Sequence, residues 1–394
     1  MKKLKDFELL APAGDFPSLI AAINAGADAV YFGLKEFNMR DSAKNFKISD
    51  LNKITSICGK KVKKYLTLNT IIYDNELKLI EQIIKKLKNK VDAVICWDLS
   101  VVKLCRKYKI PIHISTQASV ANSESAKFYK SLGARRIILA RELNLRQIKK
   151  ISKVIPIECF VHGAMCVSVS GRCFTSQFLQ NKSANRGQCT HPCRRFYSIR
   201  DQDGYELKLE NNRVMSAKDL CCLPFIEKLK QAGIISFKIE GRGRNPEYVY
   251  AVTKIYRKAL DNKLSQKELN ESMEQLKKIY NRGFSSGFYI KLPTSDDFSR
   301  SEHGESTERK EFIGKIDKYW PNISVAAFKL NSGKLKIGDE VYIIGDKTGI
   351  KRTRISSMEI NNNPIKQANK SQIIGIKLPE CRKGDDVYLI KKKQ

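Results

Sequence analysis

Acidic side chains are few in this chain of 394 residues, where 41 Asp and Glu stand against 73 Lys and Arg, a formal net charge of +32. Such an excess is typical of proteins that bind polyanions, and we expect RNA as the partner ahead of membrane lipid. A general lysine-rich bias in composition is the alternative explanation. Disorder is excluded, because 42% of the residues are hydrophobic and can form a core.

Long hydrophobic runs are absent as well. The sequence has no run of about 18 apolar residues, which excludes a membrane-spanning helix. The N-terminus, Met-Lys-Lys-Leu-Lys-Asp, lacks the apolar stretch of a secretion signal. Eleven cysteines in such a chain indicate the reducing cytoplasm, where clustered cysteines serve metal or redox chemistry rather than disulfides. We therefore predict a cytoplasmic protein without membrane contact.

Short apolar segments alternate with amphipathic, helix-length segments over residues 8–240. This alternation predicts parallel strands with helices outside them. Eight strands favour a (β/α)₈ TIM-like barrel over an open, doubly wound sheet. The predicted strands are Glu8–Ala11, Asp28–Gly33, Tyr65–Asn69, Ala93–Trp97, Ile112–Thr116, Arg136–Ala140, Ile157–Val161 and Ile235–Ile239.

The spacing between the seventh and eighth strands is unusually long. It predicts an insertion over residues 163–233 that holds six of the eleven cysteines. Because it follows a strand, this insertion should lie on the C-terminal face of the barrel, where active sites of this fold are found. We place the barrel domain at residues 1–294. After the polar linker Ser295–Lys310, strand-like segments and Gly-Asp turns predict a small β-barrel domain over residues 310–394.

Four cysteines in the insertion have the pattern of one metal site. Cys166 and Cys173 precede Cys189 and Cys193, and the flanks are rich in Gly, Ser and Asn. Four thiolates from two short loops suit a tetrahedral zinc ion or a four-iron cluster. The wide first spacing favours an iron–sulfur cluster, zinc remaining the alternative. A cluster would require the iron–sulfur assembly machinery as a partner, with Arg172, Arg186 and Arg194 as candidate counter-charges.

The remaining cysteines are expected to be buried core residues, with Cys221 and Cys222 at the start of a helix.

Polar residues at the predicted strand ends are further candidates, because this face of a barrel carries functional residues. They are Asn69, Gln117, Arg141, His162 and Glu240, with Arg242 two positions beyond. We single out Glu240, Arg242 and His162 as catalytic candidates. Glu240 and Arg242 suit a polar or dicarboxylate substrate. The alternatives are a structural salt bridge of Glu240 with Arg242 or Arg141, and a hydrogen bond from His162 towards the metal site.

Several of these segments resemble one known family. Glu158–Ser176 (ECFVHGAMCVSVSGRCFTS) is similar to the signature of the collagenase-like peptidases of unknown catalytic type. The resemblance extends over residues 8 to 290 through Leu10-Ala-Pro-Ala-Gly14, Gly26–Gly33, Ser115-Thr-Gln-Ala118, Asn185-Arg-Gly187 and Phe237–Arg242. By architecture the chain resembles the branch that synthesises 5-hydroxyuridine in tRNA. The resemblance implies a [4Fe-4S] cluster on Cys166, Cys173, Cys189 and Cys193, and prephenate-linked hydroxylation without dioxygen.

Three functions are thus open. The first is an iron–sulfur enzyme that hydroxylates a tRNA uridine, with Phe174, Phe196 or Tyr197 as stacking platforms for an extruded base. The second is a peptidase, for which His162 or His191 beside a cysteine could form a dyad, although the zinc-protease pattern H-E-x-x-H is absent. The third is an RNA-binding module with a structural zinc.

Overall fold

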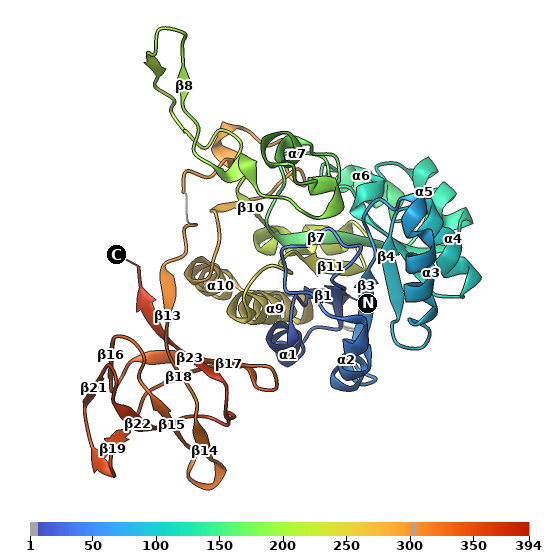
Figure 1. Ribbon diagram of the computed structural model, residues 1–394. Helices are drawn as coiled ribbons and strands as arrows, with labels where there is room; N and C mark the ends of the chain where they lie inside the picture. Colours follow the sequence, from blue (N-terminus) through green and yellow to red (C-terminus); the bar gives the residue numbers. More distant parts are fainter. Residues whose placement is uncertain (1–6, 302–303, 394) are drawn as a thin grey trace.

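The computed structural model describes residues 7–301 and 304–393 (Figure 1). The predicted leaderless N-terminus at residues 1–6 lies outside these ranges, as does part of the predicted linker. Eight parallel strands close into a barrel in the order β11-β1-β2-β3-β4-β5-β6-β7, with β7 pairing back to β11. The predicted TIM-like barrel is confirmed. Its strands are β1 (Glu8–Pro12), β2 (Ala29–Gly33), β3 (Lys63–Thr67), β4 (Ala93–Cys96), β5 (Ile112–Ile114), β6 (Ala134–Ile138), β7 (Ile157–Gly163) and β11 (Ser236–Ile239).

Helices cover the outside of the barrel. The first turn of α1 is fixed by a cap that the sequence carries, because the Asp15 side chain accepts a hydrogen bond from the Ser18 amide at 2.9 Å and Pro17 lies in the same turn. The barrel helices are α1 (Phe16–Asn24), α2 (Leu51–Cys58), α3 (Leu77–Lys85), α4 (Leu99–Lys107), α5 (Ser123–Ser131), α6 (Leu145–Ile151), α8 (Ile226–Gln231), α9 (Pro246–Asp261) and α10 (Gln266–Lys278). Among the described residues, no helix combines the length and apolar character needed to cross a membrane.

The insertion after β7 contains little regular structure. It holds α7 (Thr175–Gln180) and a hairpin of β8 (Ile199–Arg200) and β9 (Glu206–Leu207), which projects away from the barrel in Figure 1. It ends in β10 (Asp219–Cys221), which runs antiparallel to β7 and pairs with β12 (Phe284–Ser285). The predicted helix start at Cys221 is therefore wrong, since its backbone is held in a strand; both Cys221 and Cys222 are buried, as expected.

The C-terminal part consists of antiparallel strands around a separate core, in the four-stranded order β13-β23-β17-β18 and the five-stranded order β14-β15-β22-β19-β20, with a β16–β21 pair. The strands are β13 (Glu308–Lys315), β14 (Lys318–Trp320), β15 (Val325–Lys329), β16 (Lys334–Lys336), β17 (Glu340–Gly345), β18 (Gly349–Arg354), β19 (Met358–Ile360), β20 (Asn363–Pro364), β21 (Gln367–Asn369), β22 (Ile373–Lys377) and β23 (Asp386–Lys392). This part packs on the barrel through Ala21, Ile344 and Ile350.

Candidate active site at the barrel mouth

The two cysteine-bearing loops of the insertion are joined to each other. Asn185 accepts a hydrogen bond from the Cys173 amide at 2.9 Å, and the Ser176 hydroxyl accepts one from the Thr190 amide at 3.1 Å. These bonds hold the loop that carries Cys173 beside the loop that carries Cys189 and Cys193. The sequence therefore brings its two pairs of cysteines to one place.

The four thiols lie within electrostatic reach of one another. Burial raises the pKa of Cys193, Arg194 opposes this effect, and the charges of Cys166, Cys189 and Cys173 add to it. Burial also acts to raise the pKa of Cys173, but hydrogen bonds with Thr175 and Ser168 outweigh it and lower the pKa. Among residues 7–301 and 304–393, no three His, Cys, Asp or Glu side chains converge as they would on a single metal ion. Four neighbouring thiols, one of them with a lowered pKa, still suit a cationic iron–sulfur group by their donor chemistry.

The arginines beside the cysteines have partners elsewhere. Arg186 forms an ion pair with Glu76, and Arg194 donates to the carbonyls of Ala217 and Met165. Arg186 thus ties the insertion to the residue before α3, and Arg194 joins the first residues of the insertion to the segment before β10. Their main role is thus to fix the loops rather than to donate hydrogen bonds to the cysteines.

Glu240 lies at the mouth beside an arginine that the sequence did not single out. Arg40, in the loop after β2, donates to one Glu240 oxygen from Nη2 at 2.8 Å and from Nε at 3.2 Å. Arg141 approaches the other oxygen at 3.7 Å. Burial acts to raise the pKa of Glu240, but Arg40, Arg141 and Arg242 together lower it to about 2. Glu240 is therefore ionised at neutral pH.

Arg40 connects Glu240 with the cysteine site. Glu240 raises the pKa of Arg40 most strongly, and the charge of Cys189 adds to this effect. The same loop meets the insertion through its backbone, because the Asp41 amide donates to the Gly187 carbonyl at 3.1 Å. The loop after β2 thus contacts the insertion through its backbone and Glu240 through the Arg40 side chain.

Arg242 is buried at the centre of the mouth. Its Nη1 donates to the Thr67 hydroxyl at 3.0 Å, and a side chain at Gly33 would collide with this nitrogen. Burial lowers the pKa of Arg242 to about 10, an effect that Tyr31 opposes. The Tyr31 hydroxyl itself donates to the Ile239 carbonyl at 2.9 Å. No ion pair joins Arg242 to any described residue, so most of its donors remain available to a ligand.

Arg141 has unused hydrogen-bonding capacity as well. One of its nitrogens donates to the Ala164 carbonyl at 2.8 Å, and its guanidinium stacks 3.9 Å from the centre of the Phe160 ring. Its Nε is buried and has no partner among the described residues. Glu240 thus faces three arginines, and the mouth has a local positive excess.

Asn69 and Gln117 form a polar edge of the mouth. The Asn69 amide donates to the Gln117 side chain at 3.4 Å, and a side chain at Gly171 of the insertion would lie 2.8 Å from Gln117 Cγ. The insertion therefore covers the ends of β3 and β5.

His162 is not part of this group. Its ring is buried between Tyr256 and Tyr248 of α9 and Phe284 of β12. The backbone of His162 accepts a hydrogen bond from the Glu240 amide, but among the described residues the ring itself bonds only to Tyr256. Burial, helped by Arg244, lowers its pKa to about 3. A neutral imidazole with such a pKa is poorly matched to acid–base catalysis near pH 7.

The serine-hydrolase pattern G-x-S-x-G occurs at Gly283-Phe-Ser-Ser-Gly287. Ser285 lies in β12, where its hydroxyl accepts a hydrogen bond from the Gly287 amide at 3.2 Å. This is a strand edge and not the strand–turn–helix of a nucleophile elbow. In the described parts of the chain, no hydrogen bond joins a histidine to a serine. The hydrogen bond of a histidine ring there is between His162 and the Tyr256 hydroxyl.

A second charged cluster fills the barrel below the mouth. Glu8 bonds to Arg136 and, at 2.7 Å, to Tyr65, while Glu158 bonds to Lys238 at 2.9 Å and to Arg136 at 3.2 Å. The signal for this cluster was present in the sequence, since these charged residues interrupt otherwise apolar strands.

The insertion exposes an unusual amount of apolar surface. Of the 22 large hydrophobic side chains that are exposed among the described residues, ten lie between residues 167 and 214. Phe174 and Phe196 are both 61% exposed, whereas the Tyr197 hydroxyl is engaged with the Pro192 carbonyl at 2.9 Å. The other exposed members are Val167, Val169, Phe178, Leu179, Ile199, Tyr205, Leu207 and Val214.

Comparison with known proteins gives a family match: residues 14–298 match peptidase family U32. A protein of Porphyromonas gingivalis named "Collagenase" is 40% identical, over 99% of this chain and 99% of its own. A Bacillus subtilis protein named "tRNA hydroxylation protein P1" is 33% identical, over 86% of this chain and 83% of its own.

An Escherichia coli protein named "23S rRNA 5-hydroxycytidine C2501 synthase" is 40% identical, over 64% of this chain and 39% of its own length. Names of two kinds, proteolytic and RNA-modifying, therefore occur among the similar proteins.

Proposed function

This chain belongs to peptidase family U32, and we propose that it is an RNA hydroxylase, with a tRNA uridine as substrate and 5-hydroxyuridine as product. Proteins similar to it have names that refer to RNA hydroxylation as well as to collagenase, and the first kind supports this proposal. The observation that carries this proposal is that the loop of Arg40, which pairs with Glu240, is hydrogen-bonded through Asp41 to Gly187, two residues before Cys189. It joins a redox-capable set of thiols to a pocket with a positive excess.

A [4Fe-4S] cluster is the cofactor that we propose for this site. Cys166, Cys173, Cys189 and Cys193 would hold it, and Asn185 and Ser176 would keep their loops in place. When bound, such a cluster supplies electron-transfer or Lewis-acid chemistry. Zinc in the same thiol set is the alternative and would make the site purely structural.

The arginines of the mouth would orient the small co-substrate. We propose prephenate for this role, since its carboxylates suit guanidinium groups with unused donors. Arg242 and Arg141 provide such donors. Thr67 orients Arg242, and Glu240, held ionised by Arg40, orients Arg141.

The insertion would bind the RNA base. Exposed Phe174 and Phe196 offer stacking surfaces for unpaired bases, and the basic composition supports contact with the backbone. Tyr197 is not proposed for stacking, because its hydroxyl fastens it to the loop of Cys193.

Nucleoside mass spectrometry of tRNA from a strain that lacks the gene tests the function. We expect 5-hydroxyuridine-type nucleosides to disappear and to return when the wild-type gene is restored. Unchanged nucleosides in the deletion strain would contradict the proposal.

Anaerobic iron and sulfide analysis tests the cofactor. We expect iron and acid-labile sulfide in the wild type, and the loss of both in Cys189→Ala. Cys381→Ala is the matched control, because Cys381 is buried in the C-terminal core. Zinc without sulfide would favour the third function, an RNA-binding module.

A peptidase remains the second candidate because of the family and the name of the 40% identical relative. The measurement that favours it is peptide cleavage by anaerobically purified protein that is lost in Cys166→Ala while the metal content is retained.

A further inference from the structure

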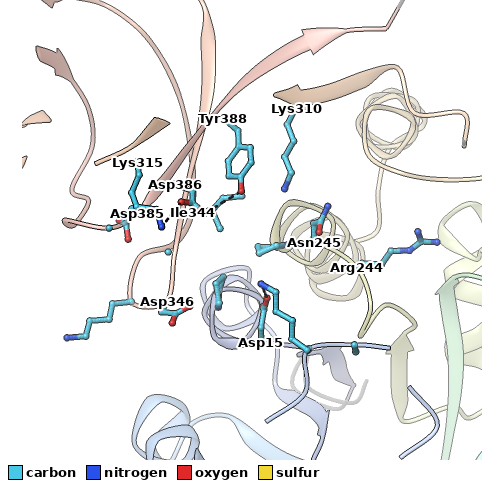
Figure 2. A pocket seen from close by; sticks show the side chains of 18 of the residues that line it. Asp15, Arg244, Asn245, Lys310, Lys315, Ile344, Asp346, Asp385, Asp386 and Tyr388 are labelled. Carbon is cyan, nitrogen blue, oxygen red and sulfur yellow. Dashed lines mark hydrogen bonds and ion pairs between the residues drawn. The ribbon is translucent and has the colours of Figure 1, made fainter. Parts of the chain in front are cut away.

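A cleft of about 750 Å³ lies between the barrel and the C-terminal strands (Figure 2). One wall is made by the N-terminal ends of α1 and α9 and the loop before α9. The other is made by β13, the turn between β17 and β18, and the residues at the start of β23. The volume is suited to a ligand group of nucleotide size. Arg242 lines this cleft too, which places the cleft next to the mouth.

Close packing fixes the relative position of the two walls. A side chain on Gly349 would lie 2.6 Å from Cγ2 of Ile20 in α1, so β18 contacts this helix through its backbone. Lys310 of β13 forms an ion pair with Glu247 of α9 at 2.8 Å, and both side chains are largely buried. The cleft is therefore a formed site and not a gap between loosely attached parts.

The acidic groups of the cleft are mostly compensated within the protein. Asp15 pairs with Lys44 at 2.9 Å, and Asp386 pairs with Lys315 at 3.4 Å. Asp385 accepts hydrogen bonds from the Thr348 hydroxyl at 2.6 Å and from the Arg382 amide at 2.8 Å.

The cations are in excess. The lining contains eight Lys and Arg and four Asp, namely Lys44, Arg242, Arg244, Lys310, Lys315, Lys347, Arg382 and Lys383 against Asp15, Asp346, Asp385 and Asp386. Within residues 7–301 and 304–393, Lys347 and Lys383 form no hydrogen bond or ion pair. Both lysines are exposed and available to an anion.

The loop between β11 and α9 adds backbone donors to the cleft. Asn245 precedes the 16-residue helix α9 without capping it, and the Glu247 amide has no hydrogen-bond acceptor among the described residues. Next to it, a Cβ on Gly243 would meet no atom within 4 Å. Helix N-termini attract anions, and the loops after the last strands of a TIM-like barrel frequently bind phosphate.

We propose that this cleft binds a backbone phosphate of the RNA whose base enters the mouth. The inference rests on the proposed function and adds the place where the RNA backbone is held. Lys347 and Lys383 approach the phosphate from the C-terminal strands, and the first turn of α9 approaches it from the barrel. The barrel and the C-terminal strands then both contact the RNA backbone next to Arg242.

Two variants with matched controls test the assignment on the full-length protein. Gly243→Asp places a carboxylate at the helix N-terminus, and Gly243→Asn is its neutral control of the same size. The double variant Lys347→Glu/Lys383→Glu reverses two charges of the cleft. Its control is Lys60→Glu/Lys61→Glu, between α2 and β3, where both lysines are exposed and neither lines the cleft. Thermal melting confirms that each variant is folded.

The measurement is the Kd for total tRNA as a function of salt, with inorganic phosphate as a competitor. For Gly243→Asp and the cleft double variant we expect Kd to rise about tenfold, and the slope of log Kd against log salt to fall by about 0.7–0.9 per lost phosphate contact. Each control should stay close to the wild type.

The possible outcomes separate the two proposals. Equal effects of the cleft variants and their controls would overturn the cleft assignment. So would unchanged tRNA binding in a cleft variant that no longer binds inorganic phosphate, since the site would then serve a small phosphate compound. Wild-type protein that does not bind tRNA would instead contradict the proposed function itself.

Discussion

The barrel contains two buried clusters of charged side chains, one in its interior and one at its mouth. They differ in how many hydrogen-bond donors remain without a partner. In the interior, Glu8 and Glu158 are matched by Arg136 and Lys238, and every one of these side chains bonds within the cluster. At the mouth, Glu240 faces Arg40, Arg141 and Arg242, and two of these arginines keep unused donors. A satisfied cluster stabilises the fold, whereas a cluster with an excess of one charge is prepared for a ligand.

The largest effect is expected from breaking the interior cluster. Arg136→Met would leave two carboxylates buried without their shared partner and should lower the free energy of unfolding by about 3–5 kcal/mol. Chemical denaturation measures this loss. Arg135→Met, at the exposed neighbouring position, should stay within about 0.5 kcal/mol of the wild type. Similar losses in both variants would show that the interior cluster is not a special source of stability.

At the mouth, the corresponding change should act on the rate and much less on stability. Arg242→Met removes a donor that we assign to the substrate, and should reduce RNA hydroxylation about 100-fold, the effect of losing one preorganised electrostatic contact. Single-turnover kinetics and a denaturation curve together test this split. A stability loss as large as that of Arg136→Met, or full activity, would remove the distinction between the two clusters.

Acid should weaken both clusters in the same pH window. The pKa values of Glu8 and Glu240 are lowered to about 2, for Glu8 because Arg136 and Tyr65 outweigh the effect of burial. Folding therefore favours the ionised forms, and this stability is present above the unfolded pKa of about 4.3 and lost as the pH falls towards 2. Thermal melting should be less dependent on pH below 5 in Glu8→Gln and in Glu240→Gln. An unaltered dependence in both would contradict the assigned ion pairs.

The smallest effect on catalysis is expected at His162. His162→Gln should cost about 1–3 kcal/mol of stability through a poorly satisfied buried group, without altering the pH dependence of the rate near neutrality. Rate profiles across neutral pH of the wild type and the variant give the test. A lost titration step in the variant would restore His162 as a catalytic acid or base.

Much of this architecture could be predicted from the sequence. The eight barrel strands follow from apolar segments at regular spacing, and the joined cysteine loops follow from their Gly- and Asn-rich flanks. Strand ends were less certain: β3 ends at Thr67, so Asn69 follows the strand and does not end it. Arg40 was missed because it lies in an irregular loop whose path no periodicity predicts. The ring of His162 was placed at the mouth by its strand position alone, yet it packs against Tyr256 of α9, at the point where β7 pairs with β10.

The interior cluster was missed for another reason. Ser236 and Lys238 alternate on one face of β11, and Glu158 stands on β7 opposite Ser236, so the pattern of inward polar residues was visible. Its interpretation required the pairing of strands far apart in the sequence. The cleft beside α9 could not be foreseen, since it depends on how the parts of the chain around two separate hydrophobic cores pack together.

The most direct test of the central claim is complementation of the deletion strain. The claim is that the cysteine site and the arginine mouth form one active site for RNA. Cys189→Ala and Arg242→Met should each leave tRNA without 5-hydroxyuridine-type nucleosides, while Cys381→Ala and Arg135→Met restore them and all four proteins accumulate in folded form. Restoration of the nucleosides by Cys189→Ala or by Arg242→Met would contradict the account.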